Sequence, residues 1–259
     1  MINVVKVGGG ILENKELLAA FLSSFHLLPG KKILVHGGGR MATELASTLG
    51  IETQMIEGRR VTDEKMLEVV TMVYGGLANK KVVAGLQALG TNALGLSGAD
   101  GNIIKSHKRV HPTIDYGMVG DVDEVDASFL IKLLDQGITP VIAPLTHDQK
   151  GQLLNTNADT IAGEVAKAVA KLAETQLILG FELDGVLSDP KDSQSVINLI
   201  TTKSFEEYKE SGVISGGMIP KLTNAFSAIN NGVKSVKICN AIKVGEAANN
   251  QSFGTLITA

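Results

Sequence analysis

The sequence predicts an α/β protein with a mostly parallel sheet that helices cover on both faces. Two observations support this prediction: apolar runs of strand length recur along the chain, and stretches of helical length lie between most of them. Strands that are apolar throughout are typical of parallel sheets, because both faces of such a sheet are buried. The 259 residues are enough for one large domain with a sizeable core.

The predicted strands are six short apolar runs, and the predicted helices are six longer stretches with helical periodicity. The strands fall at residues 4–7, 33–35, 93–96, 139–143, 177–179 and 236–238. The helices fall at residues 15–25, 41–49, 63–89, 127–136, 158–172 and 218–230, and Gly75-Gly76 offers a break within the third. Residues 102–126 interrupt the alternation with short β-prone pieces, which predicts a hairpin that can cover a small substrate.

The composition argues against three kinds of partner. The formal net charge is −3 and no basic stripe is present, so we expect no nucleic-acid partner. No apolar segment approaches the roughly 20 residues needed to cross a bilayer, and the histidines lack metal-ligand spacing, so we expect neither membrane insertion nor a metal site. Cys239 is the single cysteine, and no basic-then-apolar leader precedes the first strand, which predicts a cytoplasmic protein.

Glycine triplets follow the first two predicted strands, as Gly8-Gly9-Gly10 and Gly37-Gly38-Gly39. Because such triplets lack side chains and accept positive φ, their N–H groups can converge on an anion, and a helix that begins just afterwards adds its positive dipole end. Consecutive parallel strands joined by right-handed crossovers present their carboxyl ends at one edge of a sheet. The sequence therefore predicts two phosphate-binding loops on the same rim.

Two lysines occupy positions where an anion is expected. Lys6 lies within the first strand between valines, and a buried ammonium group costs desolvation free energy unless an anion meets it. The alternative is a lysine that reaches solvent from an edge strand. Gly216-Gly217 precede a helix with Lys221 in its first turn, where a cation is either solvent-exposed or placed to meet a phosphate.

Short polar side chains precede the helix at residues 158–172, in the order Asn155-Thr156-Asn157-Ala158-Asp159. Thr156 with Asp159 resembles a capping box, which needs no further function. Capping leaves two asparagines unexplained, and their carboxamides can bind a substrate's amide or carboxylate, while Asp159 can hold lysine ammonium groups. Upstream, the Arg59-Arg60 pair can clamp a carboxylate or be fully solvated.

The second glycine triplet also fits a different function. The pattern Gly37-x-Gly39-x-x-Ala42 follows a strand, as in dinucleotide-binding proteins, and Glu57 lies near the expected position of a ribose-binding acid. This pattern predicts an NAD-dependent oxidoreductase as an alternative. That alternative gives no role to Lys6, Asp159 or Lys221.

Taken together, the motifs resemble the amino acid kinase family nearly from end to end. Each motif is weak alone, but their order and spacing are highly specific. The matching segments are Lys6-Val7-Gly8-Gly9, Val35-His36-Gly37-Gly38-Gly39, Gly58-x-Arg60-Val61-Thr62, Asn79-Lys80, Leu154-Asn155-x-Asn157-Ala158-Asp159, Gly217-Met218-x-x-Lys221 and Gly254-Thr255. The resemblance implies one three-layer α/β/α sandwich with a mostly parallel open sheet over residues 1–259.

The resemblance also implies two lobes that bind different ligands. The N-terminal lobe, about residues 1–175, would bind the acylated amino acid, and the C-terminal lobe, about residues 176–259, would bind ATP with Mg²⁺ carried by the nucleotide. By position, the implied catalytic residues are Lys6, Lys221 and Asp159. The implied substrate-binding residues are Gly38, Gly39, Arg60, Asn155 and Asn157, and the implied nucleotide-binding residues are Gly8, Gly9, Gly216 and Gly217.

The implied reaction is ATP-dependent phosphorylation of the γ-carboxylate of N-acetyl-L-glutamate, a step of arginine biosynthesis. A carboxylate with a pKa near 4.3 is already ionised at neutral pH, so this reaction needs no general base. N-succinyl-L-glutamate is an alternative acceptor, since the sequence does not fix the size of the acyl group. A homodimer insensitive to arginine is expected, because arginine-inhibited relatives carry an extra helix before the first strand.

One segment departs from the family pattern near the nucleotide. The family usually has Thr or Ser, then Asp and Val, where this chain has Phe181-Glu182-Leu183. This departure motivates a third alternative, a non-catalytic module that senses nucleotides. Turnover of ATP in the presence of substrate would exclude it.

Overall fold

One large sheet runs through the structure, a computed structural model that describes residues 1–56, 58–249 and 253–259. Glu57, considered above as a ribose-binding acid, lies outside the described residues. In spatial order the described strands of this sheet are β12 (Leu199–Ile200), β14 (Thr255–Ile257), β13 (Ser235–Asn240), β11 (Thr175–Phe181), β1 (Ile2–Val7), β2 (Lys31–His36), β8 (Thr139–Ile142) and β5 (Ala93–Leu96).

Neighbouring strands in this sheet are parallel, except that β14 runs antiparallel to β13. All six predicted strands are confirmed, and they form the continuous parallel part from β13 to β5. The prediction missed β12 and β14, which are two and three residues long. Runs this short carry too little periodicity to be told from loops.

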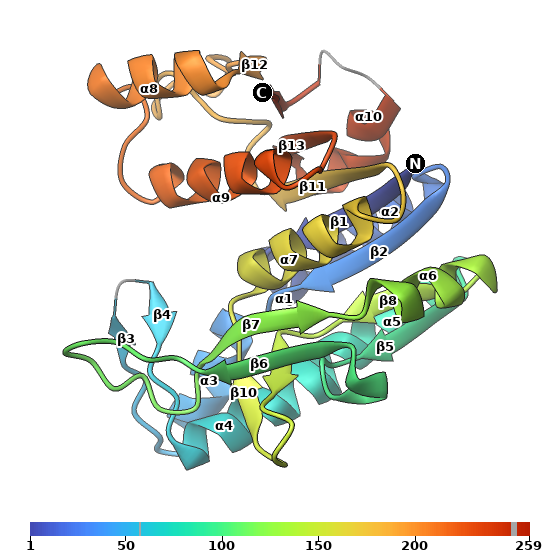
Figure 1. The fold of residues 1–259 in the computed structure, drawn as a ribbon, viewed down its shortest axis with the longest axis vertical. Helices are drawn as coiled ribbons and strands as arrows, with labels where there is room; N and C mark the ends of the chain where they lie inside the picture. Colours follow the sequence, from blue (N-terminus) through green and yellow to red (C-terminus); the bar gives the residue numbers. More distant parts are fainter. Residues whose placement is uncertain (57, 250–252) are drawn as a thin grey trace.

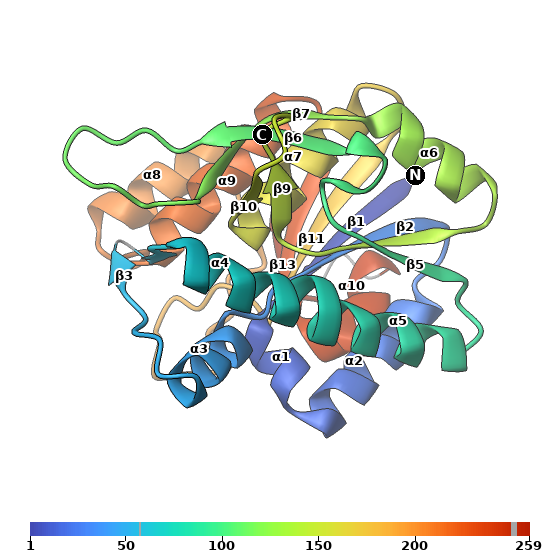
Figure 2. The same ribbon diagram turned by 90° about the horizontal axis from the view of Figure 1, so that it is seen from below.

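Helices cover both faces of the sheet, as Figures 1 and 2 show. Side chains of β1 alternate between two cores, with Val4 in one and Val5 in the other. The first core includes α6 (Ala127–Asp135), α7 (Ala158–Ala170), α8 (Thr202–Glu210) and α9 (Met218–Asn230). The second includes α1 (Gly9–Glu13), α2 (Lys15–Leu27), α5 (Asn79–Ala88) and α10 (Val244–Asn249). The predicted three-layer α/β/α sandwich is therefore confirmed.

The stretch predicted as one helix at residues 63–89 stays helical, and the break that Gly75-Gly76 offered does not form. Three segments follow one another: α4 (Glu64–Val70), the π-helix η1 (Thr71–Ala78) and α5. The glycines lie inside the wider π-helical segment, which accommodates them without ending the helix. A π-helical insertion changes which side chains face a neighbouring element, and such insertions are frequent at functional sites.

A smaller sheet lies beside the main one and confirms the predicted hairpin. Its described strands, in spatial order, are β10 (Leu153–Asn155), β9 (Leu145–His147), β6 (Ile104–Lys108) and β7 (Gly120–Val125). β6 and β7 pair antiparallel, and residues 109–119 connect them. The remaining described elements are α3 (Gly39–Thr48), the hairpin β3 (Met55–Ile56) and β4 (Arg59–Arg60), and two short 3₁₀ turns, η2 (Asp100–Asn102) and η3 (Ala241–Lys243).

Three helices escaped prediction for local reasons. α1 begins with Gly9 and Gly10, which favour loops, and α8 is mostly polar with Phe205 as its buried residue. α10 is only six residues long. Among the described residues, no helix combines the length and the apolar character needed to cross a membrane.

Candidate active site

The two glycine segments contact each other at the carboxyl ends of β1 and β2. A Cβ atom added to Gly37 would lie 3.1 Å from the Gly9 nitrogen, and one added to Gly9 would lie 3.3 Å from the Gly38 nitrogen. The predicted position on one rim is therefore confirmed, and glycine is favoured there because a Cβ atom would crowd the facing backbone. Gly8 does not use the positive φ that glycine permits, since its φ is −72°, and the helix expected after the first triplet begins within it, at Gly9.

Gly38 is required by an aromatic ring. A Cβ atom at this position would lie 2.8 Å from Cδ1 of Tyr74, which comes from the π-helical segment η1. Burial raises the pKa of Tyr74, and the nearby positive charge of the Arg60 guanidinium partly offsets that rise. The second glycine segment, Tyr74 and Arg60 therefore form one packed wall.

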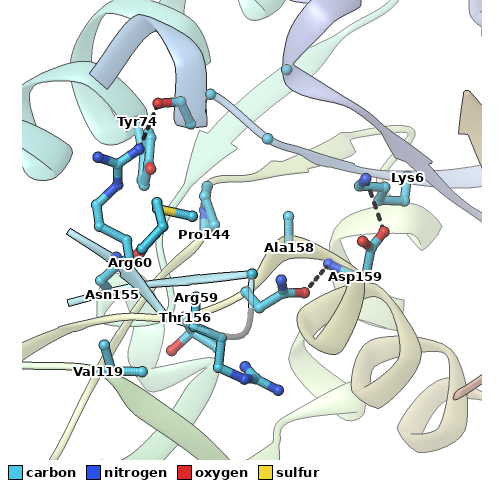
Figure 3. A pocket seen from close by; sticks show the side chains of 17 residues that line it. Lys6, Arg59, Arg60, Tyr74, Val119, Pro144, Asn155, Thr156, Ala158 and Asp159 are labelled. Carbon is cyan, nitrogen blue, oxygen red and sulfur yellow. Dashed lines mark hydrogen bonds and ion pairs between the residues drawn. The ribbon is translucent and has the colours of Figure 1, made fainter. Parts of the chain in front are cut away.

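Arg60 is buried, so the alternative of two solvated arginines does not hold for this residue. Its guanidinium donates to the Gly39 carbonyl oxygen and to Thr43 Oγ1, both at 2.8 Å, and to Thr53 Oγ1 at 3.3 Å. In Figure 3 the dashed line that ends on the Arg60 guanidinium marks one of these bonds. These bonds fix the plane of the guanidinium beside the glycine segment.

Lys6 and Asp159 form an ion pair between the end of β1 and the first turn of α7 (Figure 3). Nζ and Oδ1 are 2.8 Å apart, and the side chains are 9% and 27% exposed. The anion predicted for Lys6 is thus supplied within the chain. Because the pair is only partly accessible to water, its electrostatic attraction is screened less than that of a surface pair.

Asn157 caps α7, and the predicted capping box is wrong. The Asn157 side chain accepts from the N–H groups of Asp159 and Thr160, at 2.9 and 3.0 Å. Thr156 instead turns its hydroxyl toward Thr146 Oγ1, 2.8 Å away. Helix capping therefore explains Asn157, one of the two asparagines that the sequence analysis left without a capping role.

The other asparagine stabilises the wall on which Arg60 lies. Asn155 Nδ2 donates to Thr62 Oγ1 at 2.9 Å, and the Thr62 hydroxyl donates to the Arg60 carbonyl oxygen at 3.0 Å. These two bonds tie the end of β10 to the segment after β4. Asn155 thereby borders the same space as the arginine.

Lys221 approaches this pair from α9. Its ammonium group lies 4.1 Å from the centre of the Phe181 ring, and Lys6 Nζ lies 5.2 Å from the same centre. Burial lowers the pKa of Lys221, the Asp159 carboxylate opposes this shift, and the Lys6 charge adds to it. The structure therefore brings together the three residues predicted to be catalytic.

Two cavities open on either side of the lysine cluster. The first, of about 200 Å³, combines cationic, amide and glycine groups. It is lined by Lys6, Gly9, Gly37, Gly38, Gly39, Met55, Gly58, Arg59, Arg60, Tyr74, Val119, Pro144, Asn155, Thr156, Asn157, Ala158 and Asp159. All five residues predicted to bind the substrate line this cavity.

The second cavity, of about 230 Å³, is more apolar. It is lined by Gly8, Gly10, Ile11, Phe181, Glu182, Leu183, Gly185, Met218, Lys221 and Ile238. Of the residues predicted to bind the nucleotide, Gly8 lies here and Gly9 lies in the first cavity. Gly216 and Gly217 line neither cavity among the described residues; they form an exposed turn before α9.

The comparisons with known proteins agree with this arrangement. Residues 1–240 match the amino acid kinase family. The chain belongs to that family. It is 56% identical to the acetylglutamate kinase of Phocaeicola vulgatus over 256 residues, or 99% of this chain and 98% of the relative. It is also 56% identical to the acetylglutamate kinase of Parabacteroides distasonis over 250 residues, or 96% and 98%.

A solved structure supports the fold. The N-acetylglutamate synthase of Neisseria gonorrhoeae, complexed with coenzyme A and N-acetyl-glutamate, has a TM-score of 0.83 to this structure at 23% identity. The similarity covers 100% of this chain and 59% of that one. With kinases among the near-full-length relatives, the dinucleotide-type glycine pattern does not indicate an oxidoreductase.

Sequence reasoning gave no role to several cavity residues, among them Tyr74, Phe181 and Val119. Tyr74 was hidden in a stretch read only as helix, although the neighbouring Gly75-Gly76 is a local irregularity that points to this turn. Phe181 was noted only as a departure from the family pattern. Val119 forms an isolated bridge with Asn155 and therefore depends on a tertiary contact that no local pattern reports.

Proposed function

We propose that this protein is an acetylglutamate kinase, which transfers the γ-phosphoryl group of ATP to the γ-carboxylate of N-acetyl-L-glutamate in arginine biosynthesis. The observation that carries the proposal is the Lys6, Asp159 and Lys221 cluster at the junction of two cavities of different chemistry. The kinase family and the names of the relatives at 56% identity support it.

The reaction requires two anions to approach each other in line. The substrate carboxylate forms a bond to the γ-phosphorus, and the bond from that phosphorus to the bridging oxygen of ADP breaks. Lys6 and Lys221 would stabilise the negative charge on the transferring group from the two sides of the junction, and Asp159 would keep both ammonium groups in place. No residue is asked to remove a proton, because the carboxylate is already ionised at neutral pH.

The first cavity fits an acylated amino acid. Arg60 and Asn155 place a fixed cation and a carboxamide beside the glycine segment Gly38-Gly39, a combination suited to a carboxylate and an amide. Asn157 would add its Nδ2 group, since its Oδ1 atom is occupied in capping α7. We therefore assign substrate binding to the lobe of about residues 1–175.

The second cavity fits the nucleotide, with Gly8 near the phosphates and the apolar side chains around the base, while Gly9 would approach the phosphates from the first cavity. Gly216 and Gly217 would contribute to nucleotide binding through the turn that precedes α9 and Lys221. Mg²⁺ would be held mainly by the nucleotide phosphates, where it neutralises charge; among the described residues no cluster of three or more His, Cys, Asp or Glu side chains could hold a metal. A homodimer and a cytoplasmic location complete the proposal, on the strength of the family resemblance.

The decisive experiment measures ADP release with Mg·ATP and either N-acetyl-L-glutamate or N-succinyl-L-glutamate, with hydroxylamine present to trap the acyl phosphate. We expect hydroxamate to form in proportion to ADP with the acetyl substrate. Activity with the succinyl substrate alone would show that N-succinyl-L-glutamate, and not N-acetyl-L-glutamate, is the substrate. Absence of hydroxamate with both substrates would refute the proposal and favour a non-catalytic nucleotide sensor.

A further inference from the structure

The aromatic ring of Phe181 lies beside both lysines of the cluster. Phe181 is the last residue of β11, the strand that pairs with β1 and β13 at the centre of the sheet. The ammonium groups of Lys221 and Lys6 lie over this ring, at 4.1 and 5.2 Å from its centre. Both distances fall within the roughly 6 Å at which a cation is attracted to an aromatic face.

The charges of the cluster do not balance by themselves. Two ammonium groups share one carboxylate, and that carboxylate is ion-paired with Lys6 at 2.8 Å. Among the described residues, no carboxylate forms a comparably close ion pair with the half-buried Lys221, and the nearby Lys6 charge repels its ammonium group. The negative face of the Phe181 ring lies beside both ammonium groups and attracts this excess of positive charge.

An aromatic ring suits this task better than a second carboxylate would. A second carboxylate would neutralise Lys221, but it would also repel an incoming phosphate and occupy the ammonium N–H groups. The ring attracts the cations without forming strong hydrogen bonds, so the N–H donors that Asp159 does not occupy stay available to phosphoryl oxygens. Phe181 also lines the second cavity, where the phosphates would arrive if the proposed function holds.

We propose that Phe181 is a positioning residue of the phosphoryl transfer, and that its ring holds Lys6 and Lys221 at the junction of the two cavities until the phosphates of ATP replace it as their partner. The expected effect of Phe181 on turnover rests on the proposed function. The placement of the lysines by the ring is a property of the ligand-free protein. The two can therefore be tested separately.

The first measurement follows turnover in Phe181→Leu and Phe181→Tyr, with Phe226→Leu as the matched control. Phe226 lies on the same helix as Lys221 but packs against Phe205 in the core. We expect Phe181→Leu to lower kcat about tenfold with the KM for the acylated amino acid within about twofold, because the ring's attraction is lost while an apolar side chain remains. Phe181→Tyr keeps the ring and should retain kcat within about twofold of the unmodified protein.

The second measurement needs no activity. Acylation of Lys221 by a water-soluble amine reagent is followed against pH in the ligand-free protein by peptide mass spectrometry. Loss of the ring should move the midpoint for Lys221 to lower pH by about half a pH unit or more in Phe181→Leu, and leave it unchanged in Phe181→Tyr and Phe226→Leu.

Two results would overturn the inference: an unchanged Lys221 midpoint in Phe181→Leu, or a Phe181→Tyr variant as impaired as Phe181→Leu in both measurements. If the unmodified protein shows no turnover while the midpoint shifts as expected, the proposed function fails and the placement of the lysines by the ring stands. Thermal unfolding of each variant identifies any that fails to fold.

Discussion

The stability of this protein should fall with acid because His36 is fully buried in a site that favours the neutral ring. Its Nδ1 atom is 2.7 Å from the Gly37 carbonyl oxygen and so carries the proton, while Nε2 accepts from Asn79 Nδ2 at 3.1 Å. Asn79 Nδ2 also donates to the Val141 carbonyl oxygen, which fixes the amide. A second proton on the ring would point at an N–H donor.

The size of the effect follows from the shifted pKa of His36. Burial lowers this pKa from 6.5 to about 4, the bond to Gly37 opposes the shift, and the Lys80 charge adds to it. Between these two values the unfolded chain binds a proton that the folded chain does not, so stability is lost as the pH falls from 6.5 toward 4. Each tenfold difference in proton affinity is worth about 1.4 kcal/mol, which gives a loss of roughly 2 kcal/mol between about pH 7 and about pH 5.

The assay is urea unfolding at these two pH values for the unmodified protein and for His36→Gln. The variant removes the titrating group. Between the higher and the lower pH, its free energy of unfolding should therefore fall by about 2 kcal/mol less than that of the unmodified protein, whatever its stability at neutral pH. His111→Gln, in the loop between β6 and β7, is the matched control and should behave like the unmodified protein. Identical pH dependence in the unmodified protein and His36→Gln would refute the reasoning.

Three further predictions concern the site. Lys6→Ala and Lys221→Ala should each lower kcat by about 10² to 10³ in the coupled ADP assay, the scale for one preorganised charge-stabilising group; near-normal turnover in both would remove them from the mechanism. Arg60→Lys should raise the KM for the acylated amino acid roughly tenfold with a smaller change in kcat, because a lysine cannot reproduce the planar fork; an unchanged KM contradicts that role. Gly38→Ala should lower kcat/KM about tenfold or more and destabilise by about 1–3 kcal/mol, because the new Cβ overlaps an aromatic ring. The control Gly163→Ala, in α7 with nothing within 4 Å of the added Cβ, should keep full activity and gain about 0.5–1 kcal/mol in thermal unfolding.

The central part of the fold was predictable because its strands are apolar throughout and its helices are periodic. What escaped prediction depends on tertiary contacts. α8 exposes most of its side chains and buries Phe205, so its periodicity is faint. β14 is three residues long and is fixed by pairing with β13 and β12. The stretch around Gly75-Gly76 remains helical because the π-helical turn accommodates glycines that would favour a break in isolation.

The site was predictable where a charged side chain is buried, because its desolvation costs free energy unless an oppositely charged group lies beside it. Lys6 within a valine strand predicted an anion, and the Asp159 carboxylate lies 2.8 Å away. The role of Asn157 was harder to predict, because capping and ligand binding use the same side chain in the same local sequence. Tyr74 and Phe181 contact residues far along the chain; Gly75-Gly76 marks the turn that holds Tyr74 without indicating its contacts, and no local spacing indicates Phe181.

The cluster forms where it does because of the order of strands in the sheet. β11 lies between β1 and β13, so Phe181 ends beside Lys6 although 174 residues of chain, from 7 to 180, separate them. α7 connects β10 to β11 and presents Asp159 at its first turn, and α9 precedes β13 and presents Lys221. The two lysines therefore belong to elements from opposite sides of β11. A change in how those sides lie relative to each other alters the distance between the two ammonium groups and so the positions of the anions they would hold, and in-line transfer depends on how the reacting atoms of those anions are aligned.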